Sequence, residues 1–166
     1  MLFLHKYLVH ECTLYLNHFC TVAICCPSRV NIWTGRAAHN TSVTDISSPY
    51  GGYPEIVQEG YNTFYSGKLW NNLGVTNSNS PYVGGFNASD FFLDPYTYEY
   101  YNTWMSRNSA SPVSYKDQYS PDVIAKKAYG FLEEATAHKD RPWLLTVAPV
   151  APDSNVKIER ERHIRD

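Results

Sequence analysis

The sequence predicts an α/β fold with a mostly parallel sheet and long loops, and three observations carry this prediction. A helical pattern from Ser120 to about His138 is followed closely by the almost continuous apolar run Trp143–Val150. A helix followed by a fully apolar strand is the αβ unit of a parallel sheet that is buried on both faces. Residues 71–120 are dense in Asn, Ser, Gly, Pro and Tyr, which favours long loops packed by aromatic side chains, with few regular elements.

Length and charge narrow the function classes. The chain has 166 residues, which predicts one domain over residues 1–166, since domains usually have roughly 100–200 residues. Its net charge of −2 disfavours binding of nucleic acid by bulk electrostatics, so no nucleic-acid partner is expected. No stretch reaches the roughly 18–20 apolar residues that span a bilayer. Met1–Leu16 also lacks the uninterrupted apolar core of a signal peptide, so the sequence predicts neither a membrane span nor an export signal.

The first regular elements are predicted around residues 21–35. The apolar run Thr21–Cys26 favours a buried strand or strand end. Pro27 follows where the first turn of a helix tolerates proline, Ser28–Thr34 has helical composition, and Gly35 offers a stop. The two cysteines that end the run are therefore expected at a strand-to-helix junction, where unpaired N–H groups suit anion chemistry.

A short helix and a strand are predicted next. Pro54–Gln58 indicates a short helix closed by Gly60. Tyr61–Ser66 then indicates a strand, and Gly67-Lys68 opens the following loop.

The clearest helix begins at Ser120, which we expect to cap it, with Pro121 at the first helical position and Asp122 near the positive end of the dipole. Its apolar stripe has helical spacing and consists of Ile124, Ala128, Phe131, Leu132 and Ala135. The charged tail Lys157–Asp166 is interpreted as a solvated or frayed terminus.

The cysteines and the glycosylation triplets bear on the cellular compartment. There is no C-x-x-C pair, so a compact zinc site is not indicated, while disulfides remain open for Cys12, Cys20, Cys25 and Cys26. Asn40-Thr41-Ser42 and Asn87-Ala88-Ser89 are possible glycosylation sites at Asn40 and Asn87, which slightly favours a secretory route.

The most informative segment is Cys25-Cys26-Pro27-Ser28-Arg29, followed by Thr34-Gly35-Arg36. A cysteine-phosphatase loop needs a longer spacing between Cys and Arg than the four or three positions found here. The local signatures of papain-like and caspase-like cysteines are also missing. The segment instead resembles the sulfatase signature, C-x-P-S-R followed by T-G-R.

The resemblance extends from about Thr13 to Val156 and points to the fungal and algal arylsulfatase branch, which is related to the N-acetylglucosamine-6-sulfatases. The similar blocks are Phe19–Cys26, His39-Asn40-Thr41, Pro49-Tyr50-Gly51-Gly52-Tyr53, Tyr61–Lys68, Ser89–Tyr98 and Ala148–Pro152. The resemblance implies part of an alkaline-phosphatase-like sandwich, here as a partial N-terminal catalytic domain.

The resemblance implies hydrolysis of a sulfate ester, with Cys25 as precursor of the nucleophile. A formylglycine-generating enzyme oxidises the cysteine to formylglycine, and the hydrated aldehyde attacks the ester at sulfur. Calcium is the expected cofactor, with the modified Cys25 among its ligands. Secretion is implied by the modification, which occurs on the secretory route in eukaryotes.

Roles of the other motif residues are also implied by the resemblance. Arg29 is expected to orient and stabilise the hydrate or its oxyanion, and Lys68 to contact the sulfate. Pro27 and Ser28 shape the turn and the modification motif. Structural support of that turn falls to Thr34, Gly35 and Arg36.

The sequence departs from the family pattern at several places. Asp153 and Trp70 stand where many members have histidine, and Tyr53–Tyr61 is shorter than the matching stretch of the family. The acidic pair and the further ligands of calcium are expected outside this chain. We therefore expect that the chain does not complete a metal site, and its own activity is left open.

Three functions follow as alternatives. The first is a sulfatase, the second a catalytically inactive, truncated sulfatase-like fragment or interaction remnant, and the third a phosphoryl-transfer relative that uses unmodified Cys25. Structural interpretations stand beside the functional ones: a small buried side chain for Cys25, a surface lysine for Lys68, a solvated or structural histidine for His39, and packing for the tyrosines of residues 96–101.

Overall fold

The computed structural model describes residues 2–47, 49–51, 60–79, 83–137, 140–151 and 153. The predicted helix Pro54–Gln58 and the charged tail Lys157–Asp166 lie outside the described residues. The helical elements are α1 (Leu2–Leu4), the π-helix η1 (His5–Val9), α2 (Cys25–Thr34), the 3-10 helix η2 (Ala38–Asn40) and α3 (Ser120–Ala137). The strands are β1 (Asn62–Gly67), β2 (Ala88–Phe92), β3 (Asn102–Arg107), β4 (Val113–Lys116) and β5 (Trp143–Ala148).

These strands form one sheet in the order β4-β3-β2-β1-β5. β1 pairs in parallel with β2 on one side and with β5 on the other, where Asn62 lies opposite Trp143 and Gly67 opposite Ala148. β3 is antiparallel to both of its neighbours, so it alone among these strands runs against the others. The α/β class is confirmed, and the sheet is mixed: among the described strands two pairs are parallel and two are antiparallel.

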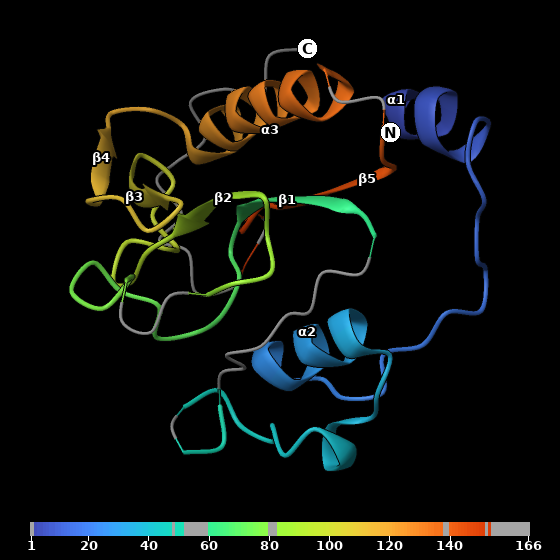
Figure 1. Ribbon diagram of the computed structural model, residues 1–166, viewed down its shortest axis with the longest axis horizontal. Helices are drawn as coiled ribbons and strands as arrows, with labels where there is room; N and C mark the ends of the chain where they lie inside the picture. The colour runs from blue at the N-terminus through green and yellow to red at the C-terminus, as the bar shows by residue number, and fades with distance from the viewer. Residues whose placement is uncertain are drawn as a thin grey trace.

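The sheet separates two layers, with α3 on one face and α2 on the other (Figure 1). Alternation along β1 builds both layers, because successive side chains of a strand point to opposite faces. Phe64 packs in a cluster with Phe131 and Ala135 of α3. Its neighbour Tyr65 belongs to the cluster on the opposite face, which includes Cys26 and Val30 of α2 together with loop residues.

The helix predicted from Ser120 is confirmed as α3, but its predicted cap is wrong. The Ser120 hydroxyl is buried and has no hydrogen-bond partner among the described residues. The carbonyl of Tyr119 instead accepts the N–H groups of Asp122 and Val123. Packing of the apolar stripe against the sheet therefore supports this helix more than side-chain capping does.

Residues 71–120 contain more regular structure than predicted, because β2, β3 and β4 all lie within them. Their composition is rich in loop-forming residues, but β2 is buried along its whole length and pairs on both sides. Strand formation here depends on backbone pairing between distant segments, which outweighs the local propensity. The predicted loop content of this region is therefore wrong for these three strands.

The strand predicted at Thr21–Cys26 is absent. Residues 21–24 have no regular structure, and Cys25 already begins α2, three residues before the predicted helical segment. Ile24 precedes the helix in an extended conformation and is 36% exposed. Gly35 does end the helix as predicted, in the left-handed conformation at φ 64°, and donates its N–H to the Asn31 carbonyl at 2.9 Å.

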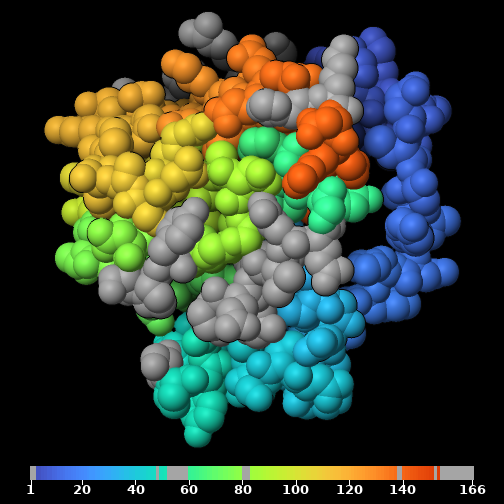
Figure 2. All heavy atoms as spheres, in the orientation of Figure 1, coloured from blue at the N-terminus to red at the C-terminus, as the bar shows by residue number. Residues whose placement is uncertain are grey.

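The expectation that the run Trp143–Val150 is buried on both faces is also wrong for the strand it forms. Trp143, Leu144 and Val147 of β5 are each more than 40% exposed. β5 lies at the edge of the sheet, so among the described residues only β1 flanks it. Figure 2 shows the N-terminal segment, in blue, running along the same side of the molecule as this edge.

Candidate active site

Cys25 is the first residue of α2, and its side chain is exposed while that of its neighbour Cys26 is buried. The exposed thiol lies at the helix end where N–H groups are unpaired and the dipole is positive. The Sγ atom of Cys25 lies 3.6 Å from the ammonium Nζ of Lys68. Two motif residues that are 43 positions apart in the sequence thus meet at one point.

Lys68 directly follows β1 and is only 4% exposed, so it is not a surface lysine. Its backbone N–H donates to the Ala148 carbonyl at 2.9 Å, which extends the pairing of β1 with β5 by one residue. Its ammonium donates to the Tyr98 hydroxyl and lies 4.5 Å from the centroid of that ring. None of the ion pairs in the described part of the chain involves Lys68.

Arg29 lies one turn after Cys25 and connects α2 to the segment that carries Lys68. Its Nη1 donates to the Lys68 carbonyl at 2.6 Å and to the Tyr65 hydroxyl at 3.1 Å. The Tyr65 hydroxyl donates to the same carbonyl at 2.6 Å. Burial raises the pKa of Tyr65, and the nearby Arg29 charge acts in the opposite direction. The guanidinium therefore holds the backbone of Lys68 in place.

The remaining motif residues lie along α2 and directly after it. Pro27 is buried in the first turn of α2, and the Ser28 hydroxyl lies 3.5 Å from the Cys20 thiol. This hydrogen bond is the main cause that lowers the pKa of Cys20. At the end of α2, the Thr34 hydroxyl donates to the Val30 carbonyl at 2.7 Å.

Arg36 contacts the end of α2 through its backbone. Its N–H donates to the Thr34 hydroxyl at 3.2 Å, while its side chain is exposed. His39 is exposed in η2, as its solvated interpretation has it, and Trp70 is 6% exposed within the core cluster on the α2 face.

The two possible glycosylation sites both lie at exposed positions. Asn40 ends η2, and Asn87 precedes β2. Oδ1 of Asn87 accepts the Thr63 N–H at 2.8 Å, so this side chain also ties β1 to β2.

Tyr98 is the member of the candidate site that sequence reasoning missed. The tyrosines of residues 96–101 are interpreted from the sequence as packing residues, and all four pack. Tyr96 stacks on Trp104, Tyr100 and Tyr101 contact Tyr119, and Tyr98 packs against the buried cluster that includes Phe92. Tyr98 alone among them contacts Lys68. The available indication was its place at the end of the block Ser89–Tyr98, which resembles the family.

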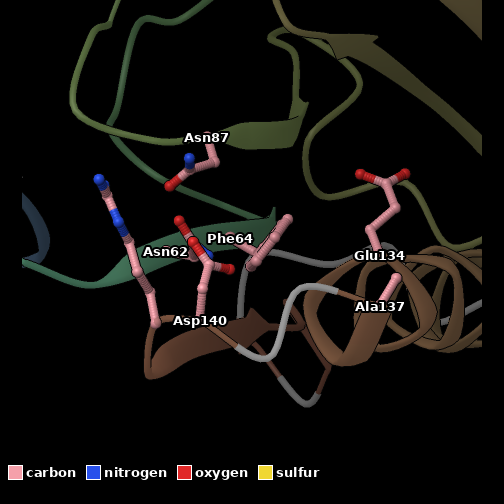
Figure 3. A pocket seen from close by; sticks show the side chains of 7 residues that line it. Asn62, Phe64, Asn87, Glu134, Ala137 and Asp140 are labelled. Carbon is pink, nitrogen blue, oxygen red and sulfur yellow. The ribbon is translucent and has the colours of Figure 1, made fainter.

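A cavity of about 520 Å³ lies at the other end of β1 (Figure 3). It is lined by Asn62, Phe64, Asn87, Glu134, Ala137, Asp140 and Arg141. Asn62 begins β1, whereas Lys68 follows its last residue, so this cavity is separate from the Cys25–Lys68 contact. A second cavity of about 510 Å³ lies beside α2, and Cys20, Ser28 and Arg36 are among its lining residues.

Comparison with known proteins assigns the chain to a protein family. Residues 2–158 match the family model described as Sulfatase. The chain belongs to the sulfatase family.

This sulfatase chain matches only part of the length of its relatives. It is 37% identical to an arylsulfatase of Volvox carteri and 34% identical to an arylsulfatase of Chlamydomonas reinhardtii, in each case over 93% of this chain and 26% of the relative. It is 28% identical to the N-acetylglucosamine-6-sulfatase of Homo sapiens over 80% of this chain and 27% of the relative. The chain thus spans about a quarter of the length of these relatives.

Solved structures confirm the fold of this sulfatase. The structure of BT4656 in complex with its substrate D-glucosamine-2-N,6-O-disulfate matches with a TM-score of 0.64 and 24% identity, over 82% of this chain and 26% of that one. The crystal structure of Ps i-CgsB matches with a TM-score of 0.57 and 17% identity, over 83% of this chain and 36% of that one.

The described residues do not fit the calcium ion that the family implies. Among them, no group of three or more His, Cys, Asp or Glu side chains is placed to hold a metal ion. Around the Cys25 thiol stand the cation of Lys68 and, one turn away, Arg29. A calcium ion prefers six to eight oxygen ligands, and two cations beside it would repel it.

Two further findings concern the cysteines and the possibility of membrane-spanning helices. Cys12, Cys20 and Cys25 are free thiols at exposed positions, whereas Cys26 is buried. Within the part of the chain that the structure describes, no helix is long and apolar enough to cross a bilayer.

Proposed function

We propose that residues 1–166 form part of a sulfatase catalytic domain and contribute to hydrolysis of an aryl or sugar sulfate ester. One observation carries the proposal. The Lys68 ammonium, buried and outside the ion pairs of the described residues, lies 3.6 Å from the exposed thiol that begins C-x-P-S-R. A buried cation of this kind suits an anionic ligand, because its charge is weakly screened and not neutralised by a carboxylate.

Cys25 is the proposed nucleophile precursor, converted to formylglycine by a formylglycine-generating enzyme. When present, the hydrated aldehyde would supply a hydroxyl that attacks the ester at sulfur, and the S–O bond to the alcohol breaks so that the alcohol leaves with a proton. The second hydroxyl then loses its proton as the C–O bond to sulfate breaks, which releases sulfate and restores the aldehyde. The exposed position of Cys25 at the start of α2 supports this role, because the side chain is accessible both to the modifying enzyme and to a substrate.

Lys68 and Arg29 are proposed to favour binding of the sulfate anion in different ways. The Lys68 ammonium binds sulfate oxygens and stabilises the negative charge that grows on them or on the leaving oxygen. Arg29 holds the carbonyl of Lys68 and so fixes where that ammonium stands, while its own charge adds to the positive potential. Because the described residues do not fit calcium, no step here uses a metal ion.

The alternative is a sulfatase-like chain without activity of its own. It is favoured by two departures from the family pattern, Asp153 and Trp70, which stand where many members have histidine. In this alternative the residues around Cys25 are retained only as packing, and Cys25 stays a thiol.

Two measurements decide between these functions. Mass spectrometry of the Cys25 peptide from the native host is expected to show formylglycine, and an unmodified thiol throughout would contradict the sulfatase proposal. Purified chain is then assayed with a chromogenic aryl sulfate, and turnover that Cys25→Ala abolishes would contradict the inactive alternative. Cys12→Ala, which removes an exposed thiol outside the site, is the matched control and is expected to keep the rate.

The same assays test phosphoryl transfer. Faster turnover of an aryl phosphate by chain with unmodified Cys25 would favour that third function. Under the sulfatase proposal, unmodified chain turns over neither ester.

We also propose that the chain passes through the secretory route. The support is the exposed sequon at Asn40 and a 28% identical relative that is named an extracellular sulfatase, from Drosophila melanogaster. Digestion with an N-glycosidase is expected to lower the apparent mass of the chain isolated from the native host. Asn40→Gln is expected to remove part of that decrease.

A further inference from the structure

Lys68 needs a local partner that holds its ammonium at the position the proposed site requires. Burial of an ammonium costs free energy unless acceptors replace its lost water. Among the described residues, its ammonium contacts the Cys25 thiol, which is a weak acceptor, and the Tyr98 hydroxyl. Tyr98 is therefore the stronger of the two acceptors.

The Tyr98 hydroxyl is held by a rigid setting. Its ring packs against the buried cluster that includes Phe92, Met105 and Ile124, on the side of the sheet that α3 covers. The preceding residue, Thr97, is 2% exposed, and the N–H of Glu99 donates to the Tyr96 carbonyl at 3.2 Å. The backbone on both sides of Tyr98 is thus fixed, so its hydroxyl has little freedom to leave Lys68.

Two independent restraints then act on Lys68. Arg29 and Tyr65 hold its backbone carbonyl, at 2.6 Å each, whereas Tyr98 holds the far end of its side chain. A long lysine side chain has many rotamers, so restraint of the backbone alone leaves the ammonium free to turn away from Cys25.

We propose that Tyr98 is a positioning residue, whose hydroxyl holds the Lys68 ammonium beside residue 25. The inference deepens the proposed function by naming a residue that prepares the sulfate-binding cation. A phenol can accept one hydrogen bond and donate another, so the Tyr98 proton stays available for an oxygen of the bound sulfate. Held in this way, the cation meets the anion without reorganisation.

The test measures Lys68 itself and requires no turnover. Each lysine is acetylated by brief treatment with acetic anhydride and quantified by peptide mass spectrometry, with the exposed Lys116 and Lys126 as references within the same molecule. Acetylation needs the amine to leave its hydrogen bond. Tyr98→Phe keeps the ring but removes the acceptor, so the rate at Lys68 relative to the references should rise roughly tenfold.

Tyr96→Phe is the matched control, because Tyr96 lies in the same loop but stacks on Trp104. It is expected to leave Lys68 acetylation unchanged. Urea unfolding of both variants is recorded in parallel, so that a rise at Lys68 with an unchanged unfolding midpoint reports local release. An unchanged Lys68 rate in Tyr98→Phe overturns the inference, and so does a rise that Tyr96→Phe reproduces.

A reciprocal measurement covers the case in which Tyr98→Phe fails to fold. In Lys68→Met the Tyr98 hydroxyl loses its donor, so the rate of nitration of Tyr98 by tetranitromethane, relative to that of the exposed Tyr129, should differ from the wild-type ratio. Equal nitration in wild type and Lys68→Met contradicts the inference. Both measurements use unmodified chain, so a failure of formylglycine formation or of turnover counts against the proposed function and leaves this result readable.

Discussion

Ser28 makes a contact in the structure that the sequence motif does not predict. Its hydroxyl lies 3.5 Å from the Cys20 thiol, and this hydrogen bond is the first cause that lowers the pKa of Cys20. A lower pKa enlarges the thiolate fraction near neutral pH, and the thiolate is the reactive form. The motif serine is therefore expected to influence a cysteine that lies before the motif.

We predict that Ser28→Ala slows alkylation of Cys20 near neutral pH by several fold. The reason is the sign of the pKa shift: without the hydrogen bond the pKa of Cys20 rises, so less thiolate is present. Iodoacetamide labelling followed by peptide mass spectrometry measures the rate. Cys12 in the same molecule is the internal control, and equal slowing at both thiols would indicate a general change instead.

At the scale of the elements, the end of β1 depends on a glycine. Gly67 has φ 118°, and a Cβ atom built on it would lie 2.1 Å from the Ala148 carbonyl oxygen of β5. That same oxygen accepts the N–H of Lys68 at 2.9 Å. The close approach of β1 and β5 that places Lys68 therefore requires a residue without a side chain.

We predict that Gly67→Ala lowers the free energy of unfolding by about 3 kcal/mol, since it combines positive φ with overlap against backbone. Gly35→Ala is the matched control, because Gly35 also has positive φ, at 64°, but has open space around its missing Cβ. Its expected cost is about 1 kcal/mol. Urea unfolding measures both, and equal losses would contradict a role for the β1–β5 contact.

At the scale of the whole molecule, one buried carboxylate joins the sheet to its covering helix. Asp90 of β2 is 1% exposed and contacts Arg107 of β3 at 3.2 Å and Lys127 of α3 at 3.3 Å. Arg107 also pairs with Glu134 of α3. This network ties three elements together on the face opposite α2, and a buried carboxylate of this kind is costly to leave without its partners.

We predict that Asp90→Asn destabilises the fold by about 3 kcal/mol, because two cations lose their buried partner. Glu133→Gln, an exposed acid of the same helix, should change stability by less than about 0.5 kcal/mol. Chemical denaturation followed by tryptophan fluorescence compares the two. A loss of similar size in both variants would show that the Asp90 network has no special share in stability.

The sequence by itself determined the elements whose pattern is local. The helix from Ser120, the strand before Lys68 and the strand from Trp143 each follow from periodicity or an apolar run, and the structure has all three. The residues Cys25, Arg29 and Lys68 could be named because they stand in short motifs with a chemical meaning, and the structure brings them to one region.

Only the tertiary structure decided the features that depend on distant segments. β2, β3 and β4 exist through backbone pairing, which outweighs a loop-like composition. Lys68 is buried because α2 and the loop of Tyr98 close over the end of β1, and Tyr98 joins the site only through that closure. The physical reason is the same for each: local propensity depends on neighbours in sequence, whereas burial and side-chain contact depend on neighbours in space.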